Sequence, residues 1–90
     1  MVKLNSEEKQ ALKFYAKGLL FIKIAENMGL DFEVAFKHVF NALVKFLYLY
    51  EHRFNTSVLD FNVKDRIAVR NGALKLGLFS LEDFMVEVNE

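Results

Sequence analysis

The feature that most constrains the fold of this chain is the stretch from Met28 to Tyr50, MGLDFEVAFKHVFNALVKFLYLY, which has no proline and no glycine after Gly29. Apolar residues in nearly every turn predict one long α-helix, which at about 1.5 Å per residue extends about 30 Å. Asp31 stands just before this helix, and we expect its carboxylate to accept hydrogen bonds from first-turn N–H groups. From Leu43 to Tyr50 only Lys45 is polar, so the rest of the chain or a second copy must cover most sides of this end.

Two short helices are predicted before the long one. Asn5 and Glu8 have the spacing of a capping box, which marks the start of the first helix, and Gly18 is a natural stop for it. A second helix is predicted from about Leu19 to Met28, ended by Gly29. The chain thus begins with two short helices and then a long one, joined by turns that contain glycine.

Two further helices are predicted after the long one. The run EHRFNTS at residues 51–57 breaks the apolar pattern and predicts a loop. Asn62 is expected to cap a fourth helix that runs to about Leu76 and ends at Gly77, and Ser80 is expected to open a last short helix with the sequence LEDFMVEV. Because β-branched residues nowhere alternate strictly, no strand is predicted. We therefore expect an all-α fold of about five helices.

The composition predicts one small domain with an excess of apolar side chains. Ninety residues suffice for one core, while a hydrophobic fraction of 53% and ten Phe residues exceed what so short a chain usually buries, which favours a homodimer. The net charge is zero, with 12 basic against 8 acidic residues in 1–79 and four acidic residues in 80–90. This surplus is compatible with a polyanion partner but does not require one. No leader pattern opens the chain and no run is long enough for a bilayer, so a cytoplasmic protein without membrane contact is expected.

A set of apolar, glycine and polar residues keeps a fixed spacing between residues 4 and 46. The pattern reads L-x-x-x-E, then L-x-x-x-A-x-G-x-x-x-x-x-I-A, then a turn glycine and H-x-x-N-x-x-x-K-[LF]; its members are Leu4, Glu8, Leu12, Ala16, Gly18, Ile24, Ala25, Gly29, His38, Asn41, Lys45 and Phe46. In this register the segment resembles the LuxR/GerE-type helix-turn-helix domain. The fourth helix of that family is echoed more loosely, by Ala68, Val69, Ala73, Leu74, Gly77 and Leu78.

The resemblance implies a single helix-turn-helix domain over 1–90, with its core in 4–50 and C-terminal helices in 51–90 that cover the core or dimerise. It also implies a DNA-binding transcription regulator whose third helix enters the major groove of double-stranded DNA. The residues then expected to contact DNA are Lys23, Glu33, Lys37, His38, Asn41 and Lys45. The apolar residues expected to form the contact between two copies are Leu47, Tyr48, Tyr50, Leu74 and Leu78.

The face of the long helix that should meet DNA departs from the family pattern. Val34 and Phe36 stand where the family has Thr and Lys, and neither can bond to phosphate or to a base edge. If Ala35, Ala42 and Phe46 point inward, the opposite face carries Glu33, Phe36, Lys37, Phe40 and Val44. Such a face suits packing against protein. The alternative interpretation is therefore a helix-turn-helix scaffold that acts as a protein-interaction module, its old DNA face covered by the C-terminal half or by a partner.

The sequence offers no arrangement of residues for catalysis or for a cofactor. It has no cysteine, no glycine-rich phosphate loop and no nucleophile–base set, and His38 and His52 are fourteen positions apart without clustered carboxylates. Glu7 with Glu8, and Glu82 with Asp83, are sequence neighbours that face different directions on a helix. We therefore expect neither an enzyme nor a metal site.

Overall fold

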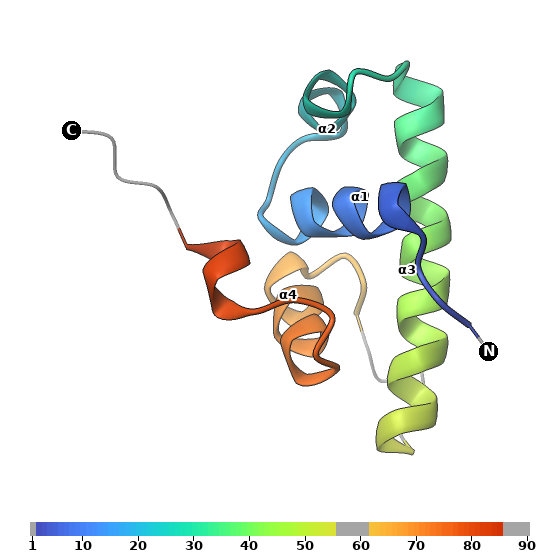
Figure 1. Ribbon diagram of the computed structural model, residues 1–90, viewed down its shortest axis with the longest axis vertical. Helices are drawn as coiled ribbons and strands as arrows, with labels where there is room; N and C mark the ends of the chain where they lie inside the picture. Colours follow the sequence, from blue (N-terminus) through green and yellow to red (C-terminus); the bar gives the residue numbers. More distant parts are fainter. Residues whose placement is uncertain (1, 56–61, 86–90) are drawn as a thin grey trace.

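The computed structural model describes residues 2–55 and 62–85, and within these ranges its regular structure is entirely helical. The elements, in chain order, are α1 Ser6–Ala16, α2 Phe21–Met28, α3 Phe32–Phe54, α4 Arg66–Lys75 and a single 3₁₀ turn, η2 Leu81–Phe84 (Figure 1). The all-α class is confirmed, but the described residues form four α-helices and not five, since the expected last helix is the one turn η2. Met85, the next residue of that expected helix, is extended, and its residues 86–88 lie outside the described residues. None of the described helices is long and apolar enough to cross a membrane.

The long helix α3 forms one side of the molecule, and the other helices pack on it or near it. Figure 1 shows α1 crossing α3 between α2 and α4, and both α1 and α2 contact α3. The largest side chains that lose all contact with solvent come from all four helices: Leu12, Ile24, Val39, Phe46 and Val69. One core therefore joins the four helices, as expected for a single small domain.

The helix boundaries marked by glycine and by the first capping signal are confirmed. The Glu8 N–H donates to Asn5 Oδ1 at 2.8 Å, and the Asn5 N–H donates to Glu8 Oε1 at 2.9 Å, which completes a capping box. Gly18 and Gly29 follow the ends of α1 and α2 with φ of 94° and 66°. This left-handed conformation strains any residue with a Cβ, so it explains why glycine occupies both positions.

The long helix α3 begins where the sequence predicts, after Asp31, but its capping bond and its last residue differ from the prediction. Asp31 is the N-cap residue, and its carbonyl accepts the first backbone bond of the helix from the Ala35 N–H, but its exposed side chain makes no capping hydrogen bond. The first-turn N–H groups of an exposed helix end are open to water, which can bond to them in place of a side chain. At the other end, the predicted loop is wrong from 51 to 54, since α3 continues to Phe54 and ends at Asn55 with a φ of 52°. Asparagine tolerates this conformation better than most residues, and it stops the helix where no glycine is available.

The start of α4 is also displaced from the predicted cap. Asp65, not Asn62, caps the helix, and its Oδ1 accepts from the N–H groups of Ile67 at 3.1 Å and Ala68 at 3.3 Å. Asn62 instead accepts from the Lys64 N–H at 3.0 Å, which forms a turn just ahead of the helix. Both residues have side chains suited to either role, so their order along the chain does not decide which one caps.

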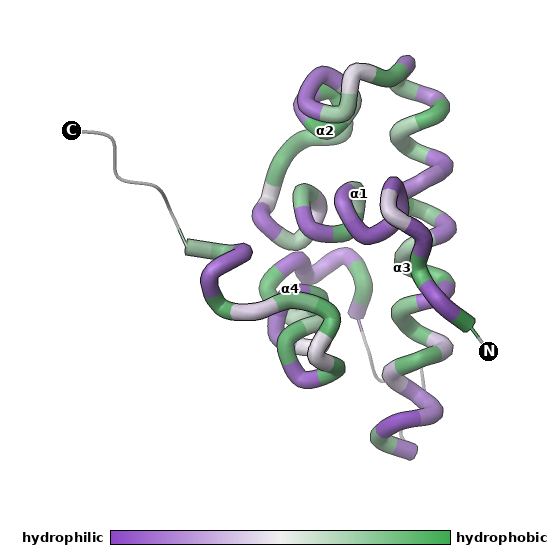
Figure 2. Tube along the Cα trace, in the orientation of Figure 1, coloured by the Kyte–Doolittle hydropathy of each residue, from purple (hydrophilic) through white to green (hydrophobic). Residues whose placement is uncertain are grey.

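The inward and outward sides of α3 follow the helical spacing as predicted. Ala35, Val39, Ala42 and Phe46 are buried, while Glu33, Phe36, Lys37, Phe40 and Val44 are exposed. Figure 2 shows hydrophobic residues along the whole length of α3, interspersed with hydrophilic ones. The helix therefore carries more apolar side chains than its own core uses, and the described part of the chain leaves Val44 and Tyr48 of residues 43–50 exposed, at 52% and 47%.

Gly72, in the middle of α4, is a close-approach position against α3. A Cβ built there would lie 2.7 Å from Cζ of the fully buried Phe46 and 3.2 Å from Cε2 of Tyr50. We expect Gly72→Ala to lower the free energy of unfolding by about 1 kcal/mol, because overpacking costs about 1–3 kcal/mol and exceeds the gain in helix propensity of about 0.5–1 kcal/mol. Urea denaturation of the two proteins measures the difference.

The matched control removes the atom that the new methyl group would strike. Phe46→Leu lacks Cζ, so in that background Gly72→Ala should lose its cost and become neutral or stabilising. If Gly72→Ala destabilises equally in both backgrounds, then contact with Phe46 is not the reason for glycine at this position.

Candidate functional site

The most prominent surface feature is a row of large apolar side chains along the outer side of α3, which we call the α3 ridge. Its members recur every four residues, and their exposed fractions lie between 45% and 57%: Phe32, Phe36, Phe40, Val44 and Tyr48. Residues at this spacing lie above one another on a helix, and sixteen residues extend about 24 Å. The ridge is therefore a continuous apolar surface rather than a set of scattered exposed side chains.

Helix α2 extends this surface at the N-terminal end of the ridge. The ring of Phe21 lies 5.2 Å from that of Phe36 and 6.4 Å from that of Phe32, measured between centroids. These contacts fix the first two ridge side chains against α2. Leu20 and Ile22, on either side of Phe21 in the sequence, are 67% and 56% exposed. The apolar surface thus includes the start of α2 as well as α3.

Three of the residues expected to contact DNA form a second row beside the ridge. Glu33, Lys37 and Asn41 are also four residues apart, each directly following a ridge residue in the sequence, and all three are exposed. The fourth expected residue, Lys23 on α2, is exposed and pairs with Glu26 at 3.3 Å. This outer side therefore carries few cations, and the negative charges of Glu33 and Glu26 would repel the phosphate backbone of a nucleic acid.

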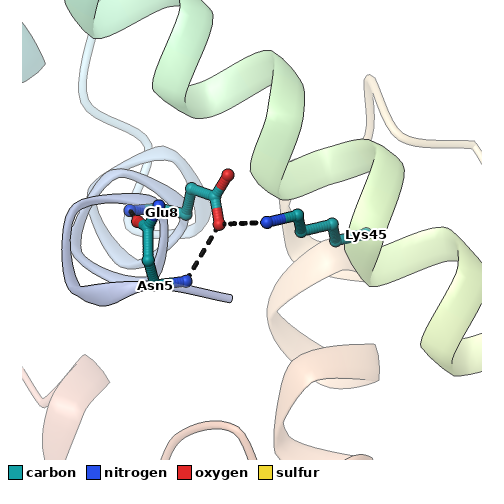
Figure 3. A network of polar contacts seen from close by, with 3 residues as sticks. All are labelled: Asn5, Glu8 and Lys45. Atoms are coloured by element: carbon teal, nitrogen blue, oxygen red, sulfur yellow. Dashed lines mark hydrogen bonds and ion pairs between the residues drawn. The ribbon is translucent and has the colours of Figure 1, made fainter. Parts of the chain in front are cut away.

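The other two expected DNA contacts lie on the flank of α3 that faces α1. Lys45 reaches across to the start of α1, where its Nζ lies 2.8 Å from Oε1 of Glu8 (Figure 3). His38 is half-buried, and its charge acts on the same carboxylate. Contact between Lys45 and DNA stays a prediction, and such a contact would compete with this ion pair.

Glu8 is the one buried charged residue among those the structure describes, with only 4% of its surface exposed. Burial alone would raise the pKa of the Glu8 carboxyl, but hydrogen bonds from the Lys45 ammonium and the Asn5 N–H, with the charges of Lys45 and His38, hold it below its ordinary value. The same carboxylate therefore caps α1 and ties it to α3. Sequence reasoning found only the first role, because a partner 37 residues away leaves no local signal.

A second tertiary contact, also absent from the sequence prediction, joins the turn after α1 to the start of α4. The Arg66 guanidinium donates to the carbonyl oxygens of Tyr15 and Leu19 and lies 4.1 Å from the centre of the Tyr15 ring. The Tyr15 hydroxyl in turn donates to the Val63 carbonyl at 2.9 Å. These contacts hold the segment between α1 and α2 against α4, and so they help to position α2 beside the α3 ridge.

The residues expected at a dimer contact divide into two groups. Tyr48 belongs to the α3 ridge and is exposed, whereas Leu47, Tyr50 and Leu78 are half-buried and pack against the core of the same chain. Leu74 is half-buried on α4. Of this set, Tyr48 is the residue that another molecule can reach most easily, and the dimer itself stays a prediction.

In the part of the chain that the structure describes, no three His, Asp or Glu side chains gather where they could hold a metal ion. The chemistry that the described surface supports best is binding through apolar contact. Neither a family model, nor a curated protein, nor a solved structure matches this chain.

Proposed function

We propose that this chain is a protein-interaction module that associates through the α3 ridge, with a second copy of itself as the partner. The observation that carries the proposal is the exposure of five large apolar side chains in one continuous row. Each loses a favourable transfer free energy of up to about 1.5–3 kcal/mol by remaining in water, so covering them stabilises a complex. Phe36 and Phe40 are 45% and 57% exposed, so the described C-terminal segment does not cover them.

The spacing of the ridge favours a second copy. Ridges of residues four apart on two helices interdigitate in the commonest class of helix packing, so one such ridge can pack against an identical one. A two-fold axis then places the same surface on both sides of the contact. With a net charge of zero, two copies carry no overall repulsion.

A second candidate is double-stranded DNA binding in transcription regulation. It is supported by the short connection from α2 to α3, at Gly29–Asp31, and by exposed Lys37 and Asn41 on the outer side of α3. Asparagine suits adenine, and lysine suits guanine or phosphate. It ranks second because the adjoining ridge is apolar and Lys23 already pairs with Glu26. If two copies associate through another surface, the outer side of α3 stays accessible to DNA.

The association test is Phe40→Glu, followed by sedimentation equilibrium at micromolar concentration. We expect the unaltered protein to dimerise and the variant to dimerise at least about tenfold more weakly, because an unpaired charge buried in an apolar contact costs more than 1.4 kcal/mol. Ile67→Glu is the matched control, because Ile67 is a 61% exposed apolar residue on α4. That change should leave association as it was, and circular dichroism should show both variants folded. A monomeric unaltered protein, or equal effects of both changes, would overturn the proposal.

A further variant, Lys37→Ala, tests the DNA candidate. Fluorescence anisotropy with random duplexes at low salt should show no binding that depends on Lys37. Duplex binding that weakens in Lys37→Ala, together with association unaffected by Phe40→Glu, would assign the outer side of α3 to DNA instead.

A further inference from the structure

A cavity of about 750 Å³ lies away from the middle of the α3 ridge, where the chain before α1 meets the last turns of α3 and the residues after α4. Its apolar lining comes from all three of these segments: Val2, Leu4, Tyr48, Leu49, Leu76 and Leu78. This volume lies within the range of about 300–1,000 Å³ that small-molecule sites have, and an apolar lining is typical of them. Tyr48 alone belongs to both the cavity and the ridge.

Apart from Tyr48, every side chain of this lining that carries a polar group is basic or an imidazole. Lys3, Lys9, His52 and Arg53 complete the lining, which contains no Asp or Glu. Within the described residues none of the four pairs with a carboxylate; Arg53 lies 5.9 Å from the Phe54 ring, and the His52 ring lies 4.4 Å from that of Tyr48. The chain as a whole has a net charge of zero, so three formal positive charges without a negative one in this lining are a local excess of positive charge. Such a site attracts an anion that also has an apolar body.

We propose that this cavity binds a long-chain carboxylate, with the hydrocarbon chain along Leu49, Leu76 and Leu78 and the carboxylate near Lys3 and Arg53. Apolar burial supplies affinity, and the cations fix the direction of the ligand. A purely apolar ligand leaves the cations without a counter-charge, and a small inorganic anion leaves the leucines in contact with water. The ligand class therefore follows from the two halves of the lining together. The proposal is independent of the proposed self-association.

The probe is laurate, titrated below its micelle concentration and followed by calorimetry. We expect saturable binding of one laurate per chain, and a loss of affinity of about tenfold or more in the variant Lys3→Gln with Arg53→Gln, since a charge-assisted hydrogen bond exceeds 1.4 kcal/mol. The matched control is Lys17→Gln with Lys64→Gln, which removes the same charge from two exposed lysines that do not line this cavity. Dodecanol, which has the same chain without the charge, should bind more weakly than laurate and equally to all three proteins.

Amide NMR spectra locate the ligand. Laurate should shift the signals of Leu49, Leu76 and Leu78 and leave those of Phe36 and Phe40 in place, and the Phe40→Glu variant, which self-associates more weakly, should bind laurate as the unaltered protein does. Binding without saturation, equal loss in the two charge variants, or shifts centred on the ridge would overturn the proposal. Binding to vesicles of an anionic phospholipid, without binding of monomeric laurate, would also overturn it, because the charge would then recognise a lipid surface.

Discussion

Replacing Phe46 with alanine should lower the free energy of unfolding by about 3–5 kcal/mol, the cost of deleting a fully buried phenylalanine ring. Phe46 is the largest side chain without solvent exposure, and its ring meets α4 at Gly72, where no side chain can fill the space left behind. A domain of this size has a total stability of only about 5–10 kcal/mol, so the variant should be close to unfolding at room temperature. Urea denaturation followed by circular dichroism measures the loss.

Two variants control this experiment. Ile67→Ala removes an apolar side chain that is 61% exposed, so it should change stability by less than about 0.5 kcal/mol. Phe46→Leu keeps most of the volume and should remain folded even if Phe46→Ala does not. A loss below about 1 kcal/mol for Phe46→Ala would show that the contact of α3 with α4 is not part of the stable core.

Lys45→Met should lower the free energy of unfolding by about 2–3 kcal/mol. Removing one partner of a fully buried ion pair costs about 3–5 kcal/mol. A smaller loss is expected here because the side chain of Lys45 is 35% exposed and water screens that end of the pair, whereas that of Glu8 is 5% exposed. Methionine replaces the apolar stem of lysine and lacks only its ammonium group, so the loss reports mainly on the uncompensated carboxylate. The measurement is a urea titration at pH 7.

A double-mutant cycle and the pH dependence of stability isolate the contribution of the Glu8–Lys45 ion pair. Glu8→Gln should cost less than Lys45→Met, and the double variant should be more stable than the sum of the two losses predicts. The pKa of Glu8 is lowered on folding, so its contribution is present above the unfolded pKa, near 4.5, and is lost as the pH falls through the folded value. The backbone N–H of Ser80 also lowers the pKa of Asp83, so some acid sensitivity should persist in Glu8→Gln. If the free energy of unfolding falls equally with decreasing pH in the unaltered protein and in Glu8→Gln, the proposed role of Glu8 is contradicted.

Structural features that depend on a few neighbouring residues are predicted correctly from the sequence. The capping box at Asn5 and the glycines that follow α1 and α2 act within one turn of the chain, so their effect does not depend on the rest of the fold. Helical spacing likewise predicts the buried Ala35 and Phe46 and the exposed Phe36, so the apolar outer side of α3 follows from the sequence, although only the alternative interpretation gives that side a role in binding protein.

Helix boundaries are predicted wrongly where two local signals of similar strength compete, or where no local signal ends the helix. Asn62 and Asp65 are both good capping residues, and in the structure Asp65 caps while the next residue, Arg66, contacts the Tyr15 and Leu19 carbonyls. The residues 51–54 remain helical because nothing before Asn55 breaks the helix and the rings of Tyr50 and Phe54 lie 4.8 Å apart. The last predicted helix begins with a capping pair, yet its described part forms only the turn η2.

What the sequence by itself determined is the helical class, the boundaries of α1 and α2 and the outward face of α3, since each depends on interactions within about one turn of helix. What only the tertiary structure decided is which distant residues meet. Lys45 joins Glu8 rather than facing outward with Lys37, and Gly72 admits the Phe46 ring. The cavity brings Lys3, Arg53 and Leu76 together from three separate segments. These pairings depend on how whole helices pack, and charge and apolarity alone allow many partners for each residue until that packing selects one.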